Sequence, residues 1–101
     1  MPVKSASSDR NIFEELGFPP EEAENLKVRA DLMIQIERVI EERGLTQLQA
    51  AEIFGVTQPR VSDLVRGKIG RFSIDALVNM LAKAGVRVEL RLAMSPSAAS
   101  S

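Results

Sequence analysis

The stretch of residues 46–66 constrains the fold of this chain more than any other, because its residues mark the starts and ends of two short helices. Thr46 begins a Thr-x-x-Gln pattern, in which each side chain accepts a hydrogen bond from a backbone N–H of the other residue, and this pattern predicts the first turn of a helix. Gly55 predicts the end of that helix, since glycine accepts the positive φ angle with which many helices close. A second helix is then expected to begin at Thr57 or Gln58.

The small and apolar residues of this stretch are spaced as two crossing helices require. Ala51 lies four residues before the glycine and lets the helices approach closely, and Val61 and Leu64 lie one turn apart on the side expected to face inward. Pro59 lies in the first turn of the second helix, where its missing N–H costs little. These features predict a helix-turn-helix motif, whose second helix lies in the major groove of DNA. A plain hairpin of two helices from another kind of bundle is the alternative.

The composition excludes several classes of function. The 101 residues suffice for one domain with a modest core, and they include no Cys, His, Trp or Tyr. A disulfide framework, a zinc site built on Cys or His, and catalysis by a Cys–His or Ser–His pair are therefore excluded. We expect no metal, no cofactor and no enzymatic activity, because the remaining carboxylates, lysines and hydroxyls form no recognisable catalytic spacing. No apolar run resembles a signal core or reaches membrane-spanning length, which predicts a soluble cytoplasmic protein.

Charge is unevenly distributed along the chain, although the net charge is only −1. Residues 1–42 carry a net charge of −5 and residues 43–101 a net charge of +4. Between residues 57 and 71, four basic side chains accompany one acidic side chain. DNA meets this local positive charge rather than the average. Since a local net charge of +3 is modest, we expect the functional unit to be a homodimer.

The remaining patterns predict an all-α bundle of about five helices. Besides the two helices of the motif, helical patterns cover residues 11–16, residues 21–43 and a last segment that Ser73 caps and Gly85 stops; whether the long helix bends near residues 28–31 is left open. We divide the chain into an N-terminal arm (1–19), a helix-turn-helix DNA-binding domain (20–85), a dimerisation strand (86–92) and a flexible tail (93–101).

Residues 86–92 alternate between apolar and charged side chains, which predicts one short β-strand with a single apolar face. The apolar side chains of this strand are Val86, Val88, Leu90 and Leu92. The sequence contains no second strong strand, and a lone strand leaves its backbone groups unpaired. We therefore expect a dimer interface in which the strand pairs with the same strand of a second copy. Pairing with a partner protein, or with the N-terminal lead around Val3, is the alternative.

Ten residues are candidates for DNA contact, because they lie at the helix starts, on the second helix or in the basic loop that follows it. They are Gln47, Thr57, Gln58, Pro59, Arg60, Ser62, Asp63, Arg66, Lys68 and Arg71. Among the candidates for base contact, Gln58 can pair bidentately with adenine, Arg60 can reach a guanine or a phosphate, and Asp63 can accept from the amino group of cytosine.

The other candidates are expected to contact the DNA backbone. Gln47 begins the first helix, where N–H groups and the helix dipole attract a phosphate. Arg66, Lys68 and Arg71 would set the register of the protein without reading sequence. Each role has an alternative: Thr57 can be only a helix cap, Asp63 can pair with Arg60 or Arg66 and repel wrong bases, and Arg66 and Lys68 can be a solvated last turn.

The stretch from Gly44-Leu45-Thr46-Gln47 through Gly55-Val56-Thr57-Gln58 to Val65-Arg66-Gly67-Lys68 resembles the Cro and lambda-repressor-like (Xre-type) family of helix-turn-helix proteins. This resemblance implies a lambda-repressor-like bundle in which the counterparts of Gln47, Thr57, Gln58 and Asp63 face DNA and the counterpart of Lys68 lies near a phosphate. Pro59 stands where this family commonly has a polar residue, so we expect readout by contact at that position.

The flanking segments resemble a narrower group, the HigA-like antitoxins of type II toxin-antitoxin systems. They share a leading Asn-Ile-Phe-Glu-Glu-Leu-Gly-Phe, a Gln-Ile-Glu-Arg-Val-Ile-Glu-Glu-Arg-Gly helix, a Phe72-Ser73 helix start and a short terminal strand. This resemblance implies a homodimer that binds an inverted-repeat operator, represses its own operon and pairs with a small basic toxin that cleaves mRNA. The acidic, apolar segment of residues 9–24 then either docks the toxin or covers the protein's own core. A stand-alone repressor without a toxin, and a protein-interaction module on the same fold, are the alternatives.

Overall fold

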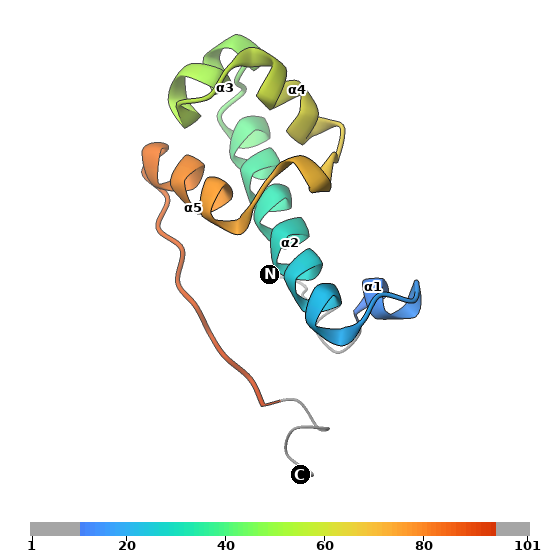
Figure 1. Ribbon diagram of the computed structural model, residues 1–101. Helices are drawn as coiled ribbons and strands as arrows, with labels where there is room; N and C mark the ends of the chain where they lie inside the picture. The colour runs from blue at the N-terminus through green and yellow to red at the C-terminus, as the bar shows by residue number, and fades with distance from the viewer. Residues whose placement is uncertain (1–10, 95–101) are drawn as a thin grey trace.

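The computed structural model describes residues 11–94, which form five α-helices and one short 3-10 turn (Figure 1). Along the chain these elements are α1 (Ile12–Glu15), α2 (Pro20–Glu42), α3 (Gln47–Phe54), α4 (Gln58–Val65), η2 (Ile69–Arg71) and α5 (Ile74–Lys83). The predicted all-α class is therefore confirmed. The expectations for the lead around Val3 and for residues 95–101 lie outside the described residues.

Helix α2 is the longest element and the support for the others. Pro20 occupies its first turn, two glutamates follow it there, and Gly44 closes it with a φ of +61°. The helix is continuous over residues 28–31, where the sequence left a bend open. In Figure 1 α5 crosses the middle of α2, while α3 and α4 lie at its C-terminal end. The Arg43 Nη2 donates to the carbonyl of Ala84 at 3.1 Å, which joins the end of α2 to the end of α5.

The main core lies where the second half of α2 meets α3, α4 and α5. Its largest fully buried side chains come from all four helices and from the residue after η2; they are Ile36, Phe54, Val61, Leu64, Phe72, Leu77 and Leu81. On α2, Ile36 is fully buried and Met33 is 5% exposed, while Leu32, Val39 and Ile40 are half-buried against the core.

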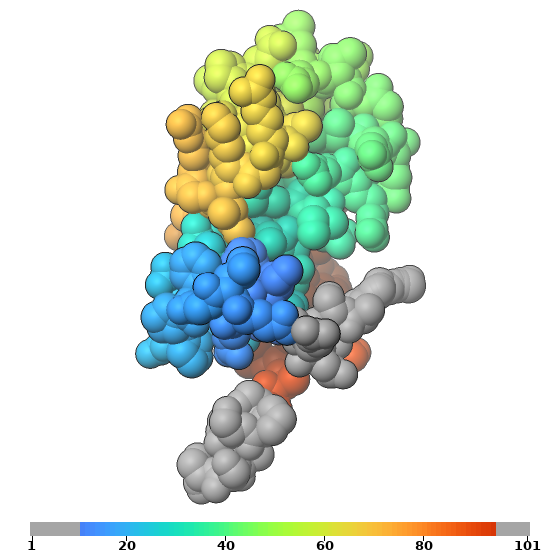
Figure 2. Space-filling model, turned by 90° about the vertical axis from the view of Figure 1, so that its right-hand side faces the viewer, coloured from blue at the N-terminus to red at the C-terminus, as the bar shows by residue number. Residues whose placement is uncertain are grey.

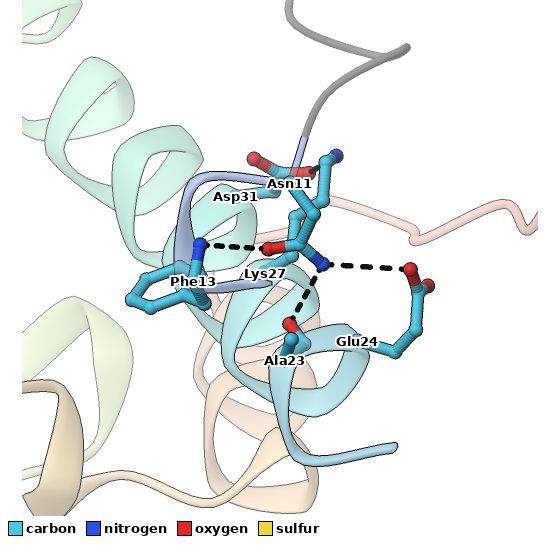
Figure 3. Close-up of polar contacts among 6 residues, drawn as sticks. All are labelled: Asn11, Phe13, Ala23, Glu24, Lys27 and Asp31. Atoms are coloured by element: carbon cyan, nitrogen blue, oxygen red, sulfur yellow. Dashed lines mark hydrogen bonds and ion pairs between the residues drawn. The ribbon is translucent and has the colours of Figure 1, made fainter. Parts of the chain in front are cut away.

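Helix α1 packs at the opposite end of α2, away from the α3–α4 unit (Figures 1 and 2). Asn11 caps α1 by accepting from the N–H of Phe13 at 2.9 Å, and its Nδ2 donates to the carbonyl of Ala23 at 3.0 Å (Figure 3). Ala23 and Leu26 are buried at this end of α2, but no residue of α1 belongs to the main core. Residues 11–19 therefore cover the buried apolar residues at this end of α2 rather than the main core, and docking of a toxin by the segment of residues 9–24 stays a prediction.

The segment after α5 leaves the helical bundle (Figure 1). Val86 and Val88 pack against the edge of the core, whereas Leu90 and Leu92 are 82% and 91% exposed. Residues 86–94 have no helix or strand in this single chain. The strand and its pairing across a dimer stay a prediction, because a lone strand has no partner for its backbone groups. Among residues 11–94, no helix has both the length and the apolar character that crossing a membrane demands.

Candidate nucleic-acid interface

The two helices of the motif begin and end as the sequence predicts. The hydroxyl of Thr46 accepts from the N–H of Gln49 at 3.1 Å, and the Gln49 side chain accepts from the N–H of Thr46 at 2.9 Å, which completes the capping box. Gly55 closes α3 with a φ of +71°. Thr57 then caps α4, its hydroxyl accepting from the N–H of Arg60 at 3.4 Å.

Helix α4 is fixed by one apolar side and presents the opposite side to solvent. Val61 and Leu64 are each 1% exposed against α3 and the core. Gln58 and Pro59 in the first turn are exposed, as is Arg66 just beyond the last turn, and Ser62 between them is half-buried. Gln47 is likewise exposed at the start of α3. A rigid helix with an open first turn can enter a groove without rearrangement of the core.

Arg60 does not point to the outward face that the helical period predicts for it. Its guanidinium lies over the ring of Phe72, 4.3 Å from the ring centroid, and its Nη1 donates to the carbonyl of Arg71 at 2.7 Å. Phe72 itself is 1% exposed. A cation over a buried ring that also donates a charge-assisted hydrogen bond is well held, so Arg60 joins α4 to the turn that follows it.

Asp63 organises the cations of that turn. Its carboxylate lies 3.2 Å from Arg71 Nη1 and 3.7 Å from Lys68 Nζ, and its side chain is only 17% exposed. Pairing of Asp63 was expected with Arg60 or Arg66, and the structure shows Lys68 and Arg71 instead. The Lys68 and Arg71 side chains remain 41% and 60% exposed, so they keep access to an anion outside the protein. The carboxylate thus gathers two cations on one side of α4.

A shallow hollow of about 420 Å³ lies beside this turn, at the start of α5. Its lining combines Arg60 and Arg71 with residues that the sequence analysis did not select for the site, namely Asn25, Arg29, Gly70, Phe72 and Ser73. In the sequence, Phe72 stands out only as part of a helix start. The capping pattern at Ser73 is visible in the sequence, but the approach of α2 to η2 depends on tertiary packing and has no local signal.

Two short helices that each bury one side, with an exposed first turn on the second helix and a turn rich in cations after it, define a helix-turn-helix DNA-binding protein. The comparisons agree: a family model described as "Helix-turn-helix domain" matches residues 12–93. The fold is also similar to that of a solved structure described as a "Putative XRE Family Transcriptional Regulator", with a TM-score of 0.68 and 31% identity over 74% of this chain and 84% of that chain. The chain belongs to the XRE family of helix-turn-helix transcriptional regulators. No curated protein matches the sequence.

Proposed function

We propose that this regulator is a sequence-specific repressor that binds an inverted-repeat operator as a homodimer. The observation that carries the proposal is the exposed first turn of α4, with Gln58 open to solvent while Val61 and Leu64 anchor the helix below it. In this geometry the start of the second helix meets base edges, and the amide of Gln58 suits adenine. Ser62 adds a short donor, and Pro59 adds an apolar contact.

The remaining contacts are proposed for the DNA backbone. Gln47 and Thr57 lie at helix starts, where backbone N–H groups favour a phosphate. Positive charge at the C-terminal end of α4 and in the turn after it comes from Arg66, Lys68 and Arg71. Because Arg60 and Asp63 are already engaged with the turn, we assign them to shaping this surface rather than to reading bases.

Residues 86–92 are proposed as the dimer interface. Leu90 and Leu92 leave most of their apolar surface in water in the single chain, and the segment of residues 86–94 that carries them is neither helix nor strand. Pairing of two such segments about a two-fold axis would bury both. Two copies would also present two α4 helices, which matches an inverted repeat. This assignment keeps the division into an arm (1–19), a DNA-binding domain (20–85), a dimerisation strand (86–92) and a tail (93–101).

The finer proposal is an antitoxin that represses its own operon in the cytoplasm and binds a small basic toxin. The supporting observation is the surface formed by α1 and the start of α2. Ile12 and Leu16 are 61% and 68% exposed there, and Phe18 and Val28 are each 39% exposed. Six acidic residues lie between residues 11 and 31 against two basic ones. An apolar patch with acidic surroundings suits a basic protein partner.

The first test is a gel shift of the purified protein on the DNA upstream of its own gene, at two salt concentrations, with random DNA as competitor. Specific and salt-sensitive binding is expected. Binding that random DNA competes equally well would contradict the repressor proposal. Co-expression with the product of a small basic neighbouring gene, followed by co-purification, separates the antitoxin from a stand-alone repressor.

A further inference from the structure

Arg29 of α2 makes the longest-range polar contact of the DNA-binding region. Its Nη1 donates to the carbonyl of Ile69 at 3.2 Å and to that of Phe72 at 3.4 Å, across 40 and 43 residues of sequence. Its Nε donates to the side chain of Asn25 at 2.8 Å, one helical turn earlier. Both ends of the η2 turn are therefore joined to α2 through a single guanidinium.

The turn needs this support because it makes few hydrogen bonds of its own. The N–H of Arg71 donates to the carbonyl of Lys68 at 3.0 Å, and the N–H of Phe72 donates to the carbonyl of Ile69 at 3.3 Å. The carbonyls of Arg71 and Phe72 accept from the side chains of Arg60 and Arg29, and the carbonyl of Ile69 accepts from Arg29 in addition to the N–H of Phe72. Carbonyls outside regular structure need such partners, and charge-assisted donors are the strongest available. Two arginines thus fix the backbone of the segment that carries Lys68 and Arg71.

We propose that Arg29 is a positioning residue for DNA binding. It holds the η2 turn so that Lys68 and Arg71 present their charges to phosphates, and it does not itself contact DNA. The proposal rests on the proposed DNA-binding function. A guanidinium is suited to this task because its N–H donors lie in one fixed plane, so that Nε is held by Asn25 while Nη1 donates to the two carbonyls, whereas the lysine ammonium is a flexible point charge.

The test compares Arg29→Gln and Arg29→Lys with Arg38→Gln, an exposed arginine on the same helix that serves as a control for the lost charge. Affinity for the upstream DNA is measured across a range of salt concentrations, and thermal unfolding shows that each variant is folded. For Arg29→Gln we expect a loss of affinity of about tenfold, the size that losing a charge-assisted hydrogen bond commonly gives. Arg29→Lys should recover only part of the affinity, and Arg38→Gln should stay within about twofold of wild type.

A double variant separates positioning from direct contact. If Arg29 acts through the turn, Lys68→Ala should cost less in the Arg29→Gln background than in wild type, since the lysine is already displaced. Fully additive losses, each lowering the salt slope by about one, would show a direct phosphate contact by Arg29 and overturn the proposal. Wild-type affinity in a folded Arg29→Gln variant would overturn it as well.

The hold of Arg29 on the backbone of the η2 turn, called the clamp below, can be tested by amide hydrogen exchange without DNA. Exchange at Gly70, Arg71 and Phe72 should accelerate in Arg29→Gln and remain unchanged in Arg38→Gln. If wild type binds no DNA, the proposed function fails, while accelerated exchange would still support the clamp. Unchanged exchange at these three amides would refute the clamp whatever the protein binds.

Discussion

Replacing Gly55 by alanine should destabilise the protein through two separable effects, and Gly44 offers a matched control for one of them. Both glycines have positive φ angles, +71° at Gly55 and +61° at Gly44. A residue with a Cβ pays roughly 1–2 kcal/mol in this left-handed conformation. A Cβ at Gly44 would meet no atom within 4 Å, whereas a Cβ at Gly55 would lie 2.5 Å from Cδ of Lys83.

The second effect is the displacement of the Lys83 side chain. Lys83 lies in the last turn of α5 and its residue is exposed, so the side chain can move to another rotamer rather than force the helices apart. We assign about 0.5–1.5 kcal/mol to this movement, the cost of an unfavourable side-chain torsion. Gly55→Ala should therefore reduce the free energy of unfolding by about 1.5–3.5 kcal/mol, and Gly44→Ala by about 1–2 kcal/mol.

Thermal and urea unfolding, followed by circular dichroism, measure both effects. The midpoint of thermal unfolding should fall by about 4–8 °C for each kcal/mol lost in a domain of this size. Lys83→Ala in the Gly55→Ala background should return the loss to that of Gly44→Ala. An equal loss in the two single variants, with no recovery when Lys83 is shortened, would refute the contact. No loss in either variant would refute the backbone argument.

Four further substitutions test the remaining assignments. Gln58→Ala should cost about 1–3 kcal/mol of binding free energy at one base pair and leave binding to random DNA unchanged, whereas Lys68→Ala should weaken binding to all sequences and lower the salt slope by about one. Gel shifts on operator and random DNA distinguish the two effects. If both variants bind as wild type does, the assignment of α4 to the major groove is wrong. Leu90→Asp should convert the proposed dimer to a monomer in light scattering while the helical circular dichroism is retained, because Leu90 lies outside the helical core. A dimer that persists would place the interface elsewhere. Leu16→Asp should change the unfolding free energy by less than about 0.5 kcal/mol, because the Leu16 side chain is largely exposed. The same substitution should abolish capture of the proposed basic partner in co-purification. Undiminished capture would contradict the assignment of the α1 surface as the docking site.

Local signals in the sequence predicted the helices well. Thr46, Gly55 and Ser73 each act on their own neighbourhood through a cap or a positive φ angle, so the bounds of α3 and the start of α5 could be read directly. The strand predicted at residues 86–92 stays a prediction. Its alternation is a local pattern, but the hydrogen bonds that would define it would have to come from a second chain.

Long-range contacts explain where the site differs from expectation. The helical period places Arg60 at the edge of an outward face, but Phe72 lies beneath it and attracts the guanidinium inward. Asp63 pairs with Lys68 and Arg71 because the η2 turn brings them back over α4. Arg29 carries no motif in its own neighbourhood, and only the crossing of α2 past η2 reveals its contacts.

The uninterrupted course of α2 fixes the rotational phase between the two ends of the molecule. Ala23 faces α1 and Met33 faces the main core, and a single helix joins them. Each residue of an α-helix turns the chain by about 100°. Inserting one residue between these positions would therefore swing α1 and its exposed apolar side chains about a quarter turn around the helix axis, while inserting a whole turn would nearly restore their direction and only lengthen the separation. Along this stretch the number of residues, more than their identity, determines which way the exposed apolar surface of α1 faces relative to the helix-turn-helix motif.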